Sequence, residues 1–118
     1  KNVEIQGNDC YIYESAFKGC KDLQTVRLED GVTYIGMNAF LGCPELETIY
    51  ISKRVKEFDE NAFNGCENVL FQVIDGSRGH SFIKDLGYDF ETVGSISFFE
   101  RIVIFFENLF SSLFGWII

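Results

Sequence analysis

Apolar residues recur along this chain with a period of 23 residues. The segment Ala-Phe-x-Gly-Cys occurs three times, at residues 16–20, 39–43 and 62–66. Three residues after each Cys comes a further apolar residue, namely Leu23, Leu46 and Val69. Self-similarity at a fixed period of roughly 20–50 residues is typical of repeat proteins, whose units bury their apolar faces only by stacking on one another.

Each repeat contains a main strand signature and a second, shorter one. Polar and apolar residues alternate at 25–28 and 48–51, which predicts strands with one buried face. A second extended stretch is expected around Thr33-Tyr34 and Lys56-Glu57, which lie between apolar residues. The repeated Gly of the motif (Gly19, Gly42 and Gly65) is expected to supply a positive φ in a tight turn.

After Cys66 the repeat loses its register. Apolar residues alternate at 69, 71 and 73, one residue out of step with the 23-residue frame. We interpret this segment as a final strand that leads into a C-terminal cap. The cap is expected to hold a short helix from Gly76-Ser77 to about Leu86, stopped by Gly87, and a closing strand over 88–93.

Residues 94–118 predict a long amphipathic helix with a wide apolar face. On a helical projection the polar residues fall within one sector, in which Ile104 and Ile118 are the only apolar side chains. The residues expected to mediate assembly through this helix are Phe99, Ile102, Phe106, Leu109, Phe110, Leu113, Trp116 and Ile117.

Three uses of this helix stay open. Spanning a membrane is disfavoured by Glu107-Asn108 at its centre. Lying in a membrane surface is disfavoured because the polar sector lacks the usual Lys and Arg. Packing against protein is therefore favoured, either on the chain's own repeats or on a second copy. We expect a homo-oligomer through this helix, with membrane contact as the alternative.

The repeats resemble the BspA-like leucine-rich repeats, a family best known from bacterial surface proteins. The resemblance lies in the three Ala-Phe-x-Gly-Cys motifs, in the Leu-x-x-(Val/Ile)-x-(Leu/Ile) pattern after the first two, and in Gly-Val-Thr-Tyr-Ile-Gly at 31–36. It covers roughly residues 1–93. It implies a right-handed solenoid with its main strands on a concave face, and an interaction module rather than an enzyme.

The expected fold is thus an α+β repeat solenoid: a short leucine-rich-repeat right-handed coil with parallel strands, a C-terminal cap and a long amphipathic helix. We expect leucine-rich repeats of period 23 over 1–75, the cap over 76–93 and the apolar helix over 94–118. Val3 and Ile5 lie 23 residues before Val26 and Leu28. Because the chain begins inside a repeat and without Met, we expect a fragment or a processed product.

Charge and residue chemistry argue against several function classes. The net charge of -8 and the pI near 4.5 disfavour nucleic-acid binding. We expect Cys20, Cys43 and Cys66 to stack as core thiols, although an incidental disulfide or a metal stays an alternative. Cys10 aligns with the outward positions Thr33 and Lys56.

We expect no catalytic site, no metal and no cofactor. His80 is the only histidine in the sequence, and we expect it to be a surface or capping residue rather than a catalytic one.

The outward side chains of the main strands are the candidate binding residues. Arg and Tyr are favoured anchors in protein interfaces, although an ordinary solvated sheet face is the competing interpretation. The candidates are Glu4, Thr25, Arg27, Thr48, Tyr50 and Gln72, with Tyr34, Lys56 and Glu57 on the second stretch as the next choice.

The resemblance implies a non-catalytic protein-interaction or adhesion module of a bacterial surface or secreted protein. Its location would be extracellular or on the bacterial cell surface, and its partner a protein, with host proteins as candidates. The alternatives are a structural spacer and a membrane-associated anchor module that acts through the C-terminal helix.

Overall fold

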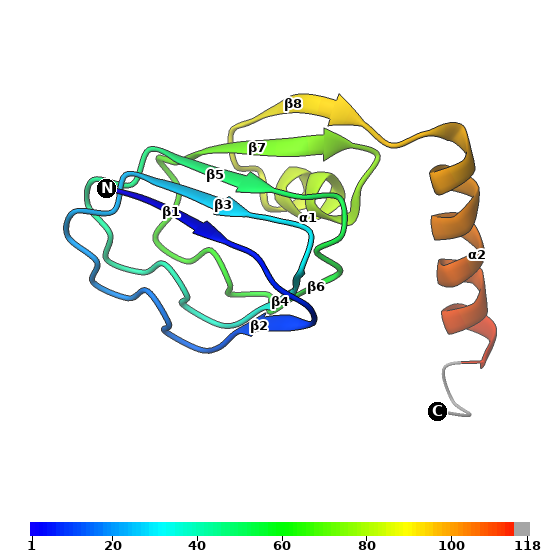
Figure 1. Ribbon diagram of the computed structural model, residues 1–118, viewed down its shortest axis with the longest axis horizontal. Helices are drawn as coiled ribbons and strands as arrows, with labels where there is room; N and C mark the ends of the chain where they lie inside the picture. The colour runs from blue at the N-terminus through cyan, green and yellow to red at the C-terminus, as the bar shows by residue number, and fades with distance from the viewer. Residues whose placement is uncertain (115–118) are drawn as a thin grey trace.

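The repeats form two parallel sheets that run along one coil, as Figure 1 shows. The computed structural model of the protein describes residues 1–114, except for the side chains of residues 98, 100 and 110–114. The long sheet has the order β1-β3-β5-β7-β8, with strands Asn2–Ile5, Thr25–Leu28, Thr48–Ile51, Leu70–Asp75 and Phe90–Ser95. The short sheet has the order β2-β4-β6, with strands Cys10–Ile12, Val32–Ile35 and Glu57–Phe58. The predicted solenoid is confirmed.

The pairing of neighbouring strands follows the 23-residue repeat period. Val26 pairs with Val3 on one side and with Ile49 on the other, so neighbouring strands are offset by the 23-residue period. Ile49 then pairs with Phe71, an offset of 22 residues. One residue is therefore missing between β5 and β7, which confirms the register break after Cys66. Because this turn is one residue shorter, Phe71 and Val73 take the buried positions of the strand.

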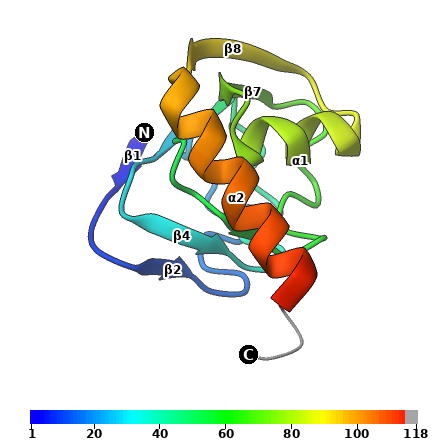
Figure 2. The ribbon, with the colours of Figure 1, turned by 90° about the vertical axis from the view of Figure 1, so that its right-hand side faces the viewer.

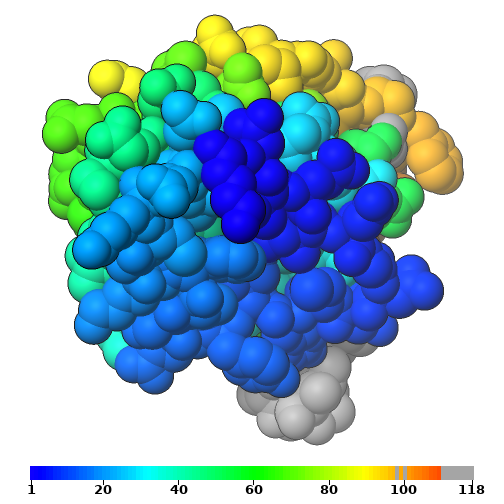
Figure 3. Space-filling view, turned by 60° about the vertical axis from the view of Figure 1, so that its left-hand side comes forward, coloured from blue at the N-terminus to red at the C-terminus, as the bar shows by residue number. Residues whose placement is uncertain are grey.

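The core lies between the two sheets and contains a ladder of phenylalanine rings. Phe40 stacks on Phe17 with ring centres 5.5 Å apart, and on Phe63 with centres 6.2 Å apart. Phe40 and Phe63 are buried, whereas Phe17 is partly buried. Phe17 belongs to the first turn of the coil, which forms the blue N-terminal end of the stack in Figure 3. The Phe residues of the three Ala-Phe-x-Gly-Cys motifs therefore form one column of stacked rings.

Glycine allows the turns of the coil to approach closely. The repeated glycines of the motif all have positive φ, from 74° to 82°, as predicted. At Gly31 a Cβ atom would lie only 1.4 Å from the backbone oxygen of Gly7. No side chain fits between these two turns, so Gly31 sets the spacing of the first two repeats.

The cap follows the predicted order of elements. Helix α1 covers Arg78–Leu86; the Ser77 hydroxyl caps its N-terminus and Gly87 ends it with φ 76°. Phe82 of α1 stacks on Phe58 of the short sheet, with ring centres 4.5 Å apart. The closing strand β8 extends to Ser95, beyond the expected end at residue 93, and adds to the long sheet beside β7.

The C-terminal helix is shorter than predicted. Helix α2 covers Phe98–Phe114, 17 residues, because Gly94 and Ser95 belong to β8. The long helix over 94–118 is therefore not supported. Figures 1 and 2 show α2 beside the end of the solenoid at which the long-sheet strands finish. The predicted assembly residues Trp116 and Ile117 lie outside the described residues, as do the side chains of Phe110 and Leu113.

The cysteines correct two predictions. Only Cys66 is fully buried, at 1% exposure, whereas Cys20 and Cys43 are half-buried. The turn that carries Cys66 lies against the cap, since the Tyr88 hydroxyl donates to the carbonyl of Phe63 at 3.2 Å.

Cys10 does not point outward as predicted. It pairs with Val32 across an irregularity in the strand register and packs against the core. The 23-residue frame placed it one residue too far along, because the frame contains no bulge.

Candidate protein-binding face

The outer side of the long sheet carries two rows of side chains in register. All six predicted residues lie in these rows. One row contains Glu4, Arg27, Tyr50, Gln72 and Glu91, and the other contains Asn2, Thr25, Thr48 and Leu70. We call these two rows the outer face. Neighbouring members of a row lie one strand spacing apart, about 4.8 Å, so a partner could contact several of them at once.

Arg27 and Tyr50 form the centre of the outer face. The Arg27 guanidinium carbon lies 4.2 Å from the centre of the Tyr50 ring, a cation–π contact. Arg27 Nε also donates to Glu29 Oε1 at 2.6 Å. Burial raises the pKa of Tyr50, and the Glu29 carboxylate adds to this effect. The Tyr50 hydroxyl therefore keeps its proton at neutral pH.

Hydrogen bonds fix both ends of the outer face. At the N-terminal end the Thr25 hydroxyl donates to Asn2 Oδ1 at 2.5 Å. At the cap end Gln72 Nε2 donates to Glu91 Oε1 at 3.0 Å. Side chains that are already ordered lose less conformational entropy when a partner binds.

Sequence reasoning missed three members of the outer face. Asn2 and Leu70 lie opposite Thr25 and Thr48, and Glu91 lies opposite Gln72. The repeat alignment did not predict Leu70 because β7 is offset by 22 residues rather than 23. It did not predict Glu91 because β8 follows helix α1 and carries no repeat motif. The alternation over 69–73, taken as a new register, could have located Leu70.

A family model described as "BspA type Leucine rich repeat region (6 copies)" matches residues 1–113. The chain belongs to the BspA-type leucine-rich repeat family. No curated protein matches it, and no solved structure does. Leucine-rich repeats generally mediate protein–protein interaction, and this repeat type is typically non-catalytic and found in surface or secreted proteins.

A second cluster, made of three tyrosines, lies at the short sheet of this BspA-type repeat protein. Tyr34 lies 5.8 Å from Tyr11, and Tyr11 lies 6.4 Å from Tyr13, measured between ring centres. Glu57 pairs with Tyr34 on the neighbouring strand, as the sequence pattern indicated. Tyr11 and Tyr13 are highly exposed and were missed, because the first repeat was aligned through its apolar positions alone.

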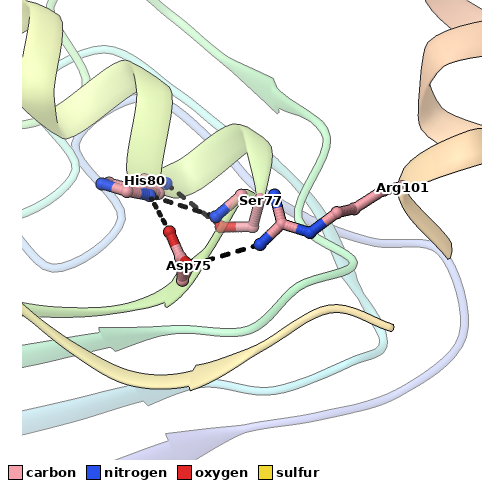
Figure 4. A network of polar contacts seen from close by, with 5 residues as sticks. Asp75, Ser77, His80 and Arg101 are labelled. Carbon is pink, nitrogen blue, oxygen red and sulfur yellow. Dashed lines mark hydrogen bonds and ion pairs between the residues drawn. The ribbon is translucent and has the colours of Figure 1, made fainter. Parts of the chain in front are cut away.

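His80 belongs to a polar network in the cap (Figure 4). Its Nδ1 accepts a hydrogen bond from the Gly76 amide at 3.1 Å and lies 3.4 Å from Asp75 Oδ1. Its ring packs at 5.0 Å from the ring of Phe90. The other Asp75 oxygen pairs with Arg101 of α2 at 3.2 Å. The network therefore joins α1, the end of β7 and α2.

Two of the four thiols, Cys43 and Cys66, are poor nucleophiles. Burial raises the pKa of Cys66 to about 12 and also raises that of Cys43. A raised pKa lowers the fraction of thiolate at neutral pH, so these two thiols react more slowly than an ordinary one. Within residues 1–114 no group of three or more His, Cys, Asp or Glu residues could hold a metal ion.

Helix α2 attaches to the solenoid through its polar side. Arg78 of α1 donates to Asn108 Oδ1 at 2.9 Å and lies 3.9 Å from Glu107 Oε2. Arg101 pairs with Asp75. Across the described part of the chain, no helix is long and apolar enough to cross a membrane.

Proposed function

We propose that this BspA-type repeat is a non-catalytic protein-binding module that recognises its partner through the outer face. The observation that carries the proposal is the Arg27–Tyr50 pair at the centre of that face. Residues of these two types supply a large share of the binding energy in protein interfaces. Here a cation–π contact and the Glu29 carboxylate already hold Arg27 in place.

The charges of the outer face suggest the chemistry of the partner segment. Glu4 and Glu91 lie near opposite ends of one row, with Arg27 and Tyr50 between them. An extended segment with basic residues at its ends and an acidic or aromatic residue between them would complement this pattern. Complementary charge suppresses wrong partners, because like charges brought together are unfavourable.

The biological setting of the proposal comes from the family. We propose an adhesion role in a bacterial surface or secreted protein, with a host-derived protein as the partner. Surface and secreted locations are typical of BspA-type repeats, and a host protein is the natural contact of an extracellular bacterial module.

Homo-oligomerisation through α2 was predicted from the sequence, and it competes with the lipid attachment proposed below for the same apolar side chains. Helix α2 has the exposed apolar side chains that such an assembly would need. Sedimentation of the full chain, included in the α2 experiment below, measures it directly.

The test of the outer face compares two double variants. Purified extracellular matrix proteins are screened against the immobilised chain, and dissociation constants are measured for the proteins that bind. Arg27→Ala with Tyr50→Ala should weaken binding by about 1–2 kcal/mol or more. The control, Lys21→Ala with Tyr13→Ala, removes the same kinds of group away from the outer face and should change binding little.

Thermal melting of both double variants excludes unfolding as the cause of lost binding. If the Arg27 and Tyr50 variant binds as the wild type does, the outer face is not the interface, and the tyrosine cluster of the short sheet becomes the next candidate. If no tested protein binds the wild type, the spacer interpretation gains support.

A further inference from the structure

Helix α2 lies on the solenoid with its apolar side outward. Three polar side chains of α2 join it to the rest of the chain: Arg101 contacts Asp75, and Asn108 and Glu107 contact Arg78. Ile104 lies on the same side and lines two cavities with residues of the solenoid. The opposite side is exposed, with Phe99 at 73%, Phe105 at 62% and Phe106 at 60%. A helix that is attached by its polar side leaves its apolar side for another partner.

The exposed apolar side is too broad for one partner helix. With 100° per residue, the exposed apolar residues from Phe105 round to Val103 span about 160° of the helix circumference. A helix that packs on a single neighbour uses an apolar stripe of roughly 100°. A helix half-immersed in a lipid surface, by contrast, buries about half of its circumference. The width of the exposed side therefore favours a flat apolar phase.

Basic residues of the solenoid lie beside this apolar side. Lys53, Arg54 and Lys56 line one small cavity together with Phe99 and Val103, and Glu107 also lines it. On the opposite, polar side of α2, Arg78 of α1 lies beside Glu107, and Arg101 of α2 itself pairs with Asp75. Five of the ten basic residues of the chain thus lie on or beside α2, although the net charge is -8.

These basic residues bear on the argument, made from the sequence, that an interfacial helix should carry Lys and Arg. Helix α2 contains a single basic residue, Arg101, which pairs with Asp75, but the loop between β5 and β6 supplies three more at 53–56. Acidic neighbours offset part of this charge, since Asp30 lies 3.9 Å from Arg54 and Glu107 lies near Arg78. Basic groups close to an anionic membrane are attracted to it, so the loop matches anionic headgroups.

We propose that α2 and the basic loop 53–56 dock this chain on an anionic lipid surface. The exposed Phe99, Phe105 and Phe106 enter the boundary between headgroups and acyl chains, while Lys53, Arg54 and Lys56 contact lipid phosphates. The solenoid stays in water, joined to α2 by Asp75 and Arg78. This attachment does not depend on the outer face and goes beyond the proposed recognition function.

The experiment measures co-sedimentation of the full chain with vesicles. One set of vesicles is phosphatidylcholine alone and the other is an equimolar mixture of phosphatidylcholine and phosphatidylglycerol. We expect strong binding to the anionic vesicles and weaker binding to the neutral ones. Phe99→Ser with Phe106→Ser should lower the partition coefficient about a hundredfold. Arg54→Glu with Lys56→Glu should lower it at least about tenfold on the anionic vesicles alone.

Matched controls test whether the loss of vesicle binding is specific to α2 and the loop 53–56 or follows from any change in charge or exposed aromatic area. Lys18→Glu with Lys21→Glu makes the same charge change in the turn before β3, and Tyr13→Ser removes an exposed aromatic group from the short sheet. Neither control should change vesicle binding more than about twofold. Thermal melting shows that each variant keeps the solenoid folded.

Three outcomes would overturn the proposal. The first is a wild-type chain that stays in the supernatant with both kinds of vesicle. The second is a Lys18 and Lys21 variant that loses as much binding as the Arg54 and Lys56 variant. The third is a vesicle-free oligomer, seen by analytical sedimentation, that Phe99→Ser with Phe106→Ser dissolves, which would assign α2 to a second copy instead.

Discussion

The phenylalanine ladder offers a sharp test of the solenoid, through the substitution Phe40→Ala. Phe40 is 1% exposed and stacks between Phe17 and Phe63 with ring planes within 5° and 9° of parallel. Alanine would remove the ring from the middle of the ladder. The rings above and below belong to two different repeats, so the change weakens the contacts between three turns of the coil.

The expected loss is large relative to the stability of so short an array. Replacing a buried Phe by Ala typically destabilises a protein by about 3–5 kcal/mol, because the cavity cannot collapse fully. Whole domains have only about 5–15 kcal/mol of stability. We therefore expect the midpoint of thermal unfolding, followed by circular dichroism, to fall by roughly 10–20 °C.

Phe17→Ala provides the matched comparison. Phe17 is the same residue type at the same repeat position, but it is only half-buried and stacks on one ring of the ladder rather than two. Its loss should be clearly smaller than that of Phe40→Ala. Equal losses at the two positions, or an unchanged melting temperature for Phe40→Ala, would refute the stacked register.

Three further predictions concern the backbone and the thiols. Gly31→Ala should unfold the first two turns, because its Cβ atom would overlap the backbone of Gly7; native-like melting of this variant would contradict the close approach. Thiol reagents should label Cys10, Cys20 and Cys43 in the folded protein well before Cys66, which is buried. Burial raises the pKa of the Cys66 thiol from 9.0 to about 12, so the native state holds its proton more tightly than the unfolded chain. Stability contributed by this thiol is complete below pH 9 and should be lost as the pH rises toward 12, and Cys66→Val should make urea unfolding less sensitive to pH in that range.

The regular part of the fold could be predicted because equivalent positions of successive repeats pair with one another, so the repeat alignment gives the strand register. Once Phe17, Phe40 and Phe63 are aligned, the buried and outward positions of every regular turn follow. The register failed at Cys10, where a bulge changes the pairing. The frame also lost its phase after Cys66, where one residue is missing. Both departures lie at an end of the regular array, where a turn has a regular repeat on one side only.

The candidate site was predictable to the extent that it follows the repeat. Glu4, Arg27, Tyr50 and Gln72 lie in one row because strand pairing carries the same position from turn to turn. Glu91 was missed because it enters the row through β8, and only the fold brings it beside Gln72. The basic loop 53–56 was missed as a partner of α2 for the same reason, since more than forty residues separate Lys53 from Phe99 in the sequence.

The two proposed surfaces are compatible because they point in different directions. Side chains of the outer face project from the face of the long sheet, roughly perpendicular to its strands. Helix α2 stands beside the ends of those strands (Figures 1 and 2), and Phe99, Phe105 and Phe106 of this helix are exposed. A lipid surface against α2 would therefore leave Arg27 and Tyr50 free for a protein partner. The two sets of variants should then separate cleanly: Arg27→Ala with Tyr50→Ala loses the partner and keeps the vesicles, and Phe99→Ser with Phe106→Ser does the reverse. Loss of both activities in either double variant would mean that one surface serves both.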